Sequence, residues 1–333
     1  MIDAQTLHKS LLSIDTHIDI PWPEGPGFLD ETRRCVDLPK MRRGYLAAGC
    51  FAAYVPQGPM MPEAHEAAFV RAIGMLDRIS TMGGTQARTC RSVAEIEAAH
   101  AAGVPMVIPC VENGHAMAAD INNLSAFAAR GARYMTLTHN GHNALADSAI
   151  PRADLGDGPS LHGGLSALGR AAIAEMNRLG MMIDVAHVSK SSMLQAAEVS
   201  RSPVLSTHSC VFSLCDHPRN MDDEQLDALR DVGGMINITA VSGFVRRSMK
   251  PDAVTPKDYV DHVEYAVSRI GLAHVGISSD FDGGGGFAGW RHAGENLAIT
   301  TELVARGYDA QAIAALWGGN FLRIMRRAEE VAA

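Results

Sequence analysis

Short apolar runs alternate along the chain with longer stretches in which the apolar positions recur at helical spacing. Runs of this length are typical of strands that are buried on both faces of a parallel sheet. Between them, residues 63–80 and 165–179 place apolar side chains close to an i, i+3, i+4 stripe, which predicts amphipathic helices, and Ser166 is suited to cap the second. The predicted strands lie near residues 12–17, 47–55, 105–112, 133–139, 181–187, 203–208, 234–239 and 275–280.

The order of these elements predicts the fold class. Strands that alternate with helices form parallel sheets with right-handed crossovers. Eight such repeats favour a distorted, closed (β/α)8 TIM barrel, in which residues 1–333 form a single catalytic domain, and the alternative is an open, doubly wound sheet. Further helices are predicted near residues 93–102, 121–130, 189–199, 222–231, 256–270 and 294–306, with two extra short C-terminal helices between about 309 and 331.

Composition and charge exclude several classes of protein. The chain has 333 residues, 47% apolar and 20% charged, with a formal net charge of −8, which is ordinary for a globular protein. No basic stripe supports a role in binding nucleic acid or a membrane surface. The N-terminal residues lack the features of a secretory signal, and no window approaches the roughly 18 apolar residues of a membrane span. The six cysteines form no Cys-x-x-Cys pair, so we expect a cytoplasmic protein with reduced thiols.

Residues that can bind a metal ion follow five of the predicted strands. Because a parallel barrel brings the carboxyl ends of its strands together at one mouth, side chains from distant parts of the sequence can meet there. This convergence predicts a metal-dependent hydrolase. The residues are His17, Asp19, Glu112, His187, His208 and Asp280.

The first predicted strand supplies a histidine and an aspartate as candidate ligands, and the third supplies a glutamate. His17 and Asp19 stand at i and i+2, so both side chains project to the same face of a strand, whereas Asp15 is expected to have a structural role. Glu112 ends a very apolar run, where a carboxylate is costly to bury unless it is paired or binds metal. A glutamate with one oxygen toward each of two cations would bridge them. The alternative for Glu112 is an ion pair with an arginine.

Two histidines close successive strands. Neutral imidazole suits Zn²⁺, and no cysteine stands at a comparable strand end. A lone histidine is more often an ordinary core residue, but His187 and His208 on neighbouring strands favour metal binding. Asp184, three residues before His187, is expected to support the structure around it.

Three more residues are candidates for catalysis or substrate binding. Asp280 follows the last strand and is placed to accept a proton from a metal-bound water and pass it to a leaving amine. The alternative is that this segment only forms a turn, because the sequence Asp282-Gly283 is typical of turns. His139 ends the fourth strand and is a candidate donor to the scissile carbonyl, with His142 as a weaker substitute. Arg219 is a candidate for binding a substrate carboxylate, against the ordinary interpretation of a solvated loop arginine.

In this order, the candidate residues and their neighbours resemble the membrane dipeptidase (renal dipeptidase) family, peptidase family M19, within the metal-dependent amidohydrolase superfamily. The resemblance extends over nearly the whole chain. The phrases that carry it are Asp15-Thr16-His17-Ile18-Asp19, Val111-Glu112-Asn113-Gly114-His115, Leu137-Thr138-His139-Asn140, Asp184-Val185-Ala186-His187-Val188-Ser189, Ser206-Thr207-His208-Ser209 and Asp280-Phe281-Asp282-Gly283.

The resemblance implies a zinc-dependent dipeptidase. On the family's pattern, His17 and Asp19 hold one Zn²⁺, His187 and His208 hold a second, and Glu112 bridges the two. A water that bridges the ions attacks the peptide bond. Members hydrolyse dipeptides with a free C-terminal carboxylate and tolerate a D-residue at that position. A homodimer is also expected from the family.

The same pattern implies the roles of the remaining residues. Asp280 is the catalytic acid and base and also contacts substrate, His139 binds the carbonyl, and Arg219 binds the carboxylate. The loops 151–162 and 283–294 resemble the family's sequences less closely. Because these loops are expected to shape the substrate pocket, the preference among dipeptides stays open.

Two other hypotheses are compatible with the fold. One is a different binuclear hydrolase that acts on an N-acyl amino acid, a lactone or a phosphoester, for which Arg219 would be dispensable. The other is a catalytically silent binding protein, but such a protein has no need of a proton acceptor such as Asp280.

Overall fold

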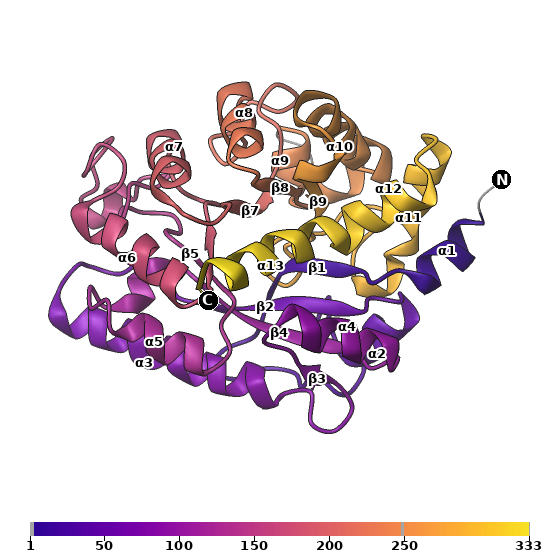
Figure 1. Cartoon of the computed structure of the whole chain (residues 1–333), viewed down its shortest axis with the longest axis horizontal. Coiled ribbons are helices and arrows are strands. Elements are labelled where there is room, and N and C mark those ends of the chain that lie inside the picture. Colours follow the sequence, from indigo (N-terminus) through magenta and orange to yellow (C-terminus); the bar gives the residue numbers. More distant parts are fainter. Residues whose placement is uncertain (1–2, 248–249, 333) are drawn as a thin grey trace.

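Parallel strands surrounded by helices make up the computed structural model, which describes residues 3–247 and 250–332 (Figure 1). Eight strands follow one another in the order β1-β2-β4-β5-β6-β7-β8-β9, and every neighbouring pair is parallel. Ile18 and Phe281 form a further parallel bridge that brings the two ends of the sheet together. The strands are β1 (Ile14–Asp19), β2 (Ala48–Tyr54), β4 (Met106–Glu112), β5 (Tyr134–Thr136), β6 (Met182–Asp184), β7 (Leu205–Ser209), β8 (Met235–Ile238) and β9 (Val275–Ile277).

This arrangement confirms the predicted distorted (β/α)8 barrel, and the helices fall where their periodicity indicated. Ser166 caps α6 by accepting a hydrogen bond from the backbone N–H of Gly169, as expected from its position. The predicted helices correspond to α3 (Pro62–Thr81), α4 (Val93–Ala101), α5 (Asn123–Ala129), α6 (Ala167–Arg178), α7 (Lys190–Val199), α8 (Asp223–Asp231), α10 (Pro256–Ile270), α11 (Leu297–Ala305), α12 (Ala310–Ala314) and α13 (Asn320–Ala332).

Several short elements were not predicted, because each is too short to show a period. β3 (Arg88–Thr89) is a further strand, off the main path of the sheet, that pairs with β4. Three short helices also escaped the pattern, namely α1 (Ala4–Ser10), α2 (Leu38–Arg43) and α9 (Ser242–Val245).

Three strands, β5, β6 and β9, end three residues earlier than predicted, so His139, His187 and Asp280 lie three residues beyond a strand rather than at its end. After β6 and β9, backbone N–H groups donate hydrogen bonds to buried carboxylates instead of to a neighbouring strand. Asp184 accepts from the N–H groups of Ala186 and Thr207, both at 3.0 Å. Asp15 accepts from the N–H groups of Ser279 at 3.0 Å and His17 at 3.3 Å. These contacts agree with the structural roles expected of Asp15 and Asp184.

Side chains inside the barrel alternate along each strand with side chains that face the helices. In β4, Met106, Ile108 and Cys110 belong to the inner cluster, and Glu112 continues their phase. The first residues of many strands also belong to the inner cluster, where α13 covers them with Phe321 and Met325. The barrel is therefore filled with side chains at its N-terminal end and polar at the other.

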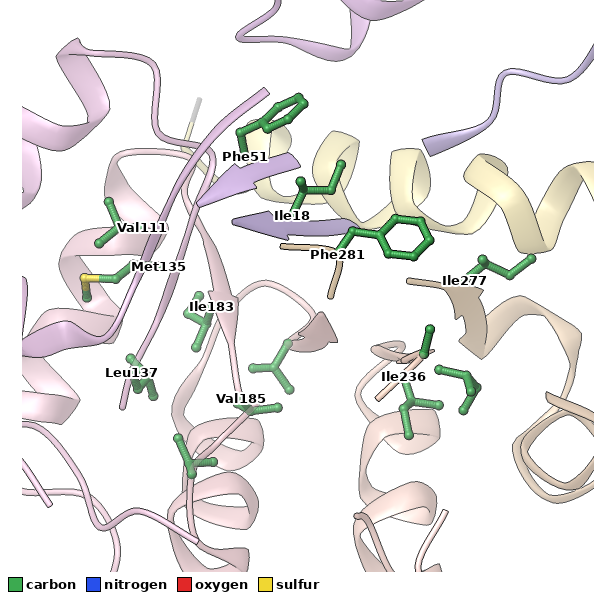
Figure 2. Close-up of a cluster of buried hydrophobic side chains, with 14 of the residues drawn as sticks. Ile18, Phe51, Val111, Met135, Leu137, Ile183, Val185, Ile236, Ile277 and Phe281 are labelled. Atoms are coloured by element: carbon green, nitrogen blue, oxygen red, sulfur yellow. The ribbon is translucent and has the colours of Figure 1, made fainter. Parts of the chain in front are cut away.

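The outward-facing side chains form a second, larger cluster beneath the helices. Figure 2 shows Ile18, Phe51, Val111, Ile183 and Ile277 pointing from their strands into this layer. Burial of such side chains on both faces is what the uniformly apolar runs of the sequence reflect. Among residues 3–247 and 250–332, no helix combines the length and apolarity needed to cross a membrane.

Two strands carry an irregularity that turns a histidine into the barrel. Ile14 lies in the inner cluster but Ile18 in the outer one, although four residues in a regular strand would place both on the same face. The register between β1 and β2 shifts between Asp15 and Ile18, and that between β7 and β8 shifts between Ser206 and Ser209. Such bulges commonly re-aim a side chain at the rim of a barrel. Here they allow His17 and His208 to face the interior.

Close packing at the start of α6 gives a test of the fold. A Cβ at Gly169 would lie only 2.1 Å from the carbonyl oxygen of Leu145. Gly169→Ala is therefore expected to lower the free energy of unfolding by about 1–3 kcal/mol, although alanine in a helix is normally the more stable residue. Gly243→Ala is the matched control, because its Cβ would meet no described atom within 4 Å. Urea unfolding of both variants checks this, and equal stability would contradict the packing.

Candidate metal centre and active site

The predicted metal ligands converge around Glu112, which is 3% exposed. Its Oε2 lies 3.4 Å from Nε2 of His17. Its Oε1 lies 3.2 Å from Nε2 of His187 and 3.6 Å from Nε2 of His208. Residues separated by nearly 200 positions in the sequence thus meet at one carboxylate, at the carboxyl ends of β1, β4, β6 and β7.

The hydroxyl of Tyr134 determines that Nδ1 of His17 carries a proton. Its Nδ1 lies 2.9 Å from the hydroxyl of Tyr134, and that hydroxyl donates its proton to the carbonyl oxygen of Thr16 at 3.0 Å. Nδ1 must therefore be the donor to Tyr134, because the hydroxyl has no second proton to give. Nε2 of His17 is thereby directed at Glu112, the orientation that it needs to bind a metal ion once it has given up its own proton.

The same reasoning applies to the other two histidines. Thr207 donates its hydroxyl proton to Asp184 at 2.7 Å, so Nδ1 of His208 is the donor in its 2.8 Å contact with that hydroxyl. Nδ1 of His187 lies 3.2 Å from the side-chain oxygen of Asn140, which can only accept. Both Nε2 atoms then carry lone pairs, and burial lowers the pKa of His187 and His208 well below the usual range, so both rings stay neutral.

These donors fit a bound cation. The Nε2 atoms of His187 and His208 lie 2.9 Å apart, and two lone pairs at that distance repel unless a positive charge lies between or beside them. Nε2 of His17 and Oδ1 of Asp19 are buried and find no hydrogen-bond partner among the described residues. Burial alone would lower the pKa of His17, but the negative charge of Glu112 raises that pKa to about 10, so in the metal-free site a proton on Nε2 supplies the positive charge that a metal ion would replace.

Two groups of potential ligand atoms share Glu112: one consists of His17, Glu112 and His208, and the other of Glu112, His139 and His187. The rings of His17 and His208 lie side by side, as do those of His139 and His187, while the Nε2 atoms of the expected pair His187 and His208 are 2.9 Å apart, so the two groups adjoin one another. Asp19 belongs to neither group within the described part of the chain, but it lines the same cavity.

Two further carboxyl groups lie at this mouth, and their surroundings disfavour the ionised form of both. Burial, followed by the charge of Glu112, raises the pKa of Asp19 well above its usual value. Burial is also the main reason that the pKa of Asp280 is raised to about 7, with Glu112 contributing and His17 opposing. Both side chains approach Gly283, where a Cβ would lie 2.4 Å from Oδ1 of Asp280 and 2.5 Å from Oδ2 of Asp19. Glycine at this position allows the two carboxylates to come close together.

A cavity of about 360 Å³ opens onto this centre. Arg219 lies in its wall, 4% exposed, with Nη2 donating to the carbonyl oxygen of His208 at 3.1 Å. Its Nε has no partner among the described residues. Burial lowers the pKa of Arg219 to about 10, which leaves it charged at neutral pH. The lining residues are Asp19, Tyr54, Glu112, His139, Asn140, Ile150, His187, His217, Arg219, Val241, Phe244, Asp280, Gly283 and Gly284.

The structure separates the candidates from their substitutes. His142 is 1% exposed and held within its loop, with Nδ1 accepting from the N–H of Ser148 and Nε2 donating to the carbonyl oxygen of Gly158, whereas His139 lines the cavity. Asp282 accepts from the backbone N–H of Cys35 at 2.7 Å and ties that segment to the barrel, whereas Asp280 lines the cavity.

Sequence reasoning missed the residues that orient the histidines and those that shape the cavity. Asn140 and Thr207 adjoin His139 and His208 in the sequence, which is a signal that could have been used. Tyr134 is one apolar-run residue among many, and its contact with His17 depends on the closed barrel.

Buried imidazoles and carboxylates at the carboxyl ends of barrel strands define a metal-dependent hydrolase. The comparison with known families agrees. Residues 1–333 match the family described as membrane dipeptidase (peptidase family M19), and the chain belongs to this family. It is therefore a metallo-dipeptidase, a hydrolase that acts on dipeptides.

Curated relatives and solved structures support this assignment. The chain is 32% identical over 311 residues to Dipeptidase aclJ of Aspergillus oryzae, covering 91% of this chain and 72% of the relative. It is 32% identical over 337 residues to Dipeptidase verJ of Clonostachys rogersoniana, covering 96% and 84%. The probable dipeptidase PvdM from Pseudomonas aeruginosa superimposes with a TM-score of 0.94 at 28% identity, covering 99% and 98% of the two chains. A metallo peptidase from Rhodobacter sphaeroides, liganded with a phosphinate mimic of L-Ala-D-Ala, gives 0.83 at 25% identity, covering 96% and 99%.

Proposed function

We propose that the enzyme holds two Zn²⁺ ions bridged by Glu112 and hydrolyses dipeptides that carry a free C-terminal carboxylate, with either an L- or a D-residue at that end. One observation carries the proposal. The Nε2 lone pairs of His187 and His208 face Glu112 on the wall of a cavity that also contains the buried, charged Arg219.

The ligands would divide between the two ions as the family pattern implies. His17 and Asp19 would hold one ion, His187 and His208 the other, and Glu112 both. When bound, such a pair of ions supplies Lewis acidity for the peptide carbonyl and a water activated for attack at neutral pH. Tyr134, Thr207 and Asn140 fix the Nδ1 protons and so keep the Nε2 atoms available.

The remaining polar groups of the cavity have separate tasks. The Arg219 guanidinium would bind the C-terminal carboxylate, which orients the scissile bond and lowers the entropic cost of the reaction. A carboxylate oxygen of Asp280 would take a proton from the attacking water and deliver it to the leaving amine. His139, 22% exposed at its side chain, would donate to the carbonyl oxygen.

Space beside the centre supports the acceptance of a D-residue. Gly284 lines the cavity, and a Cβ there would meet no described atom within 4 Å. Gly284 therefore adds no bulk to the wall of the cavity, which favours space for a side chain of either configuration. The Rhodobacter sphaeroides neighbour is liganded with a mimic of L-Ala-D-Ala, which is a dipeptide of this kind.

A panel of L-Ala-D-Xaa and L-Xaa-L-Xaa dipeptides, incubated with zinc-loaded enzyme, tests the proposal. We expect hydrolysis of members of both series, and the released amino acids are quantified to measure it. A metal-replete enzyme that cleaves none of them would contradict the proposal.

Arg219→Ala gives a second test with a distinctive pattern. Loss of the guanidinium is expected to lower kcat/KM for dipeptides roughly 10²-fold or more, mainly through KM, because a charge-assisted contact and the orientation of the substrate are lost. For the corresponding dipeptide amides, which lack the carboxylate, the wild type and the variant are expected to differ by less than about threefold. Equal losses on acids and amides would contradict the role of Arg219.

A further inference from the structure

An apolar wall stands beside Arg219 in the cavity, and the chemistry described above gives it no role. The Cζ atom of Arg219 lies 5.4 Å from the centre of the Phe244 ring, within the range of a cation–π contact. The ring of His217 also packs against the Phe244 ring, with ring centres 4.4 Å apart. Val241 lies three residues before Phe244, and all of these residues line the cavity. The wall is therefore in contact with the guanidinium that the substrate reaches.

Hydrogen bonds fasten this wall to the loop that carries Arg219. The side-chain amide of Asn220 donates to the carbonyl oxygens of Phe244 and Cys215, both at 2.8 Å. Its oxygen accepts from the backbone N–H of Cys210 at 3.2 Å. His262 adds a contact of 2.9 Å to the carbonyl oxygen of Val245. The distance between Phe244 and the guanidinium is thus fixed by the fold rather than by the two side chains alone.

Covalent geometry then places one part of the substrate beside the wall. In a C-terminal amino acid, the first side-chain atom is two bonds from the carboxylate carbon, a distance of roughly 2.5 Å. When Arg219 holds the carboxylate, the side chain of that residue must start among the immediate neighbours of the guanidinium. Tyr54 also lines the cavity, and its ring packs against His139, with ring centres 4.8 Å apart. The N-terminal residue of the substrate, beyond the scissile bond, would lie toward His139, which is proposed to contact the carbonyl oxygen.

We infer that Phe244 determines which C-terminal side chains the enzyme accepts, by limiting the size of the apolar side chain that fits beside Arg219. This inference rests on the proposed function, because it requires Arg219 to bind the C-terminal carboxylate. Phe244 contacts the substrate side chain and sets specificity, and it takes no part in proton transfer.

The test compares kcat/KM for two dipeptide series in the wild type and in Phe244→Ala. The first series is Ala-Ala, Ala-Leu and Ala-Phe, with the C-terminal residue in the configuration that the wild type cleaves faster. The second is Ala-Ala, Leu-Ala and Phe-Ala. Removing the ring opens the wall, so the ratio of kcat/KM for Ala-Phe over Ala-Ala is expected to rise about tenfold. The ratio for Phe-Ala over Ala-Ala is expected to stay within twofold of the wild-type value.

Two further variants keep the test decisive. Phe212→Ala removes another phenylalanine, 38% exposed on the preceding loop and outside this cavity, and is expected to keep the wild-type ratios in both series. Phe244→Leu keeps an apolar side chain and is expected to shift the C-terminal ratio in the same direction by a smaller factor, so the test survives if Phe244→Ala does not fold.

The outcomes separate this inference from the proposed function. A wild type that cleaves the dipeptides, with both ratios unchanged in Phe244→Ala and Phe244→Leu, would overturn the inference alone. A change confined to the N-terminal series would also overturn it. A zinc-loaded wild type that cleaves neither series would contradict the proposed function and the inference together.

Discussion

Asp280→Asn is expected to lower kcat roughly 10²- to 10⁴-fold, the usual contribution of a positioned general acid or base. The asparagine keeps the shape of the side chain but cannot accept the proton of the attacking water or return it to the amine. KM is expected to change little, because the guanidinium of Arg219 remains. Steady-state kinetics on the preferred dipeptide, with metal content measured on the same samples, check the prediction.

Asp282→Asn is the matched control, two residues further along the same loop. Its carboxylate bonds to the backbone N–H groups of Cys35 and Val36, so the variant is expected to lose stability while kcat stays within about tenfold of the wild type. A variant of Asp280 as active as that of Asp282 would contradict the assignment of the proton acceptor.

Glu112→Gln is expected to remove at least one ion per chain and to lower kcat/KM by more than about a thousandfold. An amide offers a single oxygen, and its NH2 group cannot face a cation, so the bridge between the two sets of histidines is lost. Even residues that only support a ligand typically cost about 10- to 100-fold in metal affinity when replaced. Metal analysis of the dialysed protein, followed by activity with excess Zn²⁺, measures both effects.

Asp37→Asn supplies a comparison for a buried carboxylate outside the cavity. Asp37 is fully buried and pairs with Lys40, so its replacement is expected to lower the melting temperature but to leave the bound metal unchanged. If Glu112→Gln bound as much metal as Asp37→Asn, Glu112 would not be a bridging ligand.

The sequence predicted where the chemistry lies because parallel strands are buried on both faces. A polar residue at the end of such a run, like Glu112 after Val111, has few structural explanations, and the closed barrel leaves one place where the strand ends meet. The alternation of apolar runs with helical patterns was long enough to predict the barrel and most of its helices. The grouping of the potential ligand atoms around Glu112 was not predictable from such patterns, since one group joins residues at or after β1, β4 and β7 and the other joins residues at or after β4, β5 and β6.

Features that depend on local register or on tertiary contacts were not predictable in this way. Register shifts within β1 and β7 turn His17 and His208 inward, and no residue type in those segments predicts such shifts. The early ends of β6 and β9 follow from the side-chain bonds of Asp184 and Asp15. Phe244 lies on a helix of four residues, which is too short to have a periodic signal.

Titration of the metal-free enzyme with Zn²⁺, followed by its activity on the dipeptide that it cleaves fastest, tests the central claim most directly. We expect no hydrolysis without metal, and an activity that rises to a plateau at two equivalents of Zn²⁺ per chain. A plateau at one equivalent, or hydrolysis that does not depend on added metal, would contradict a two-ion centre bridged by Glu112.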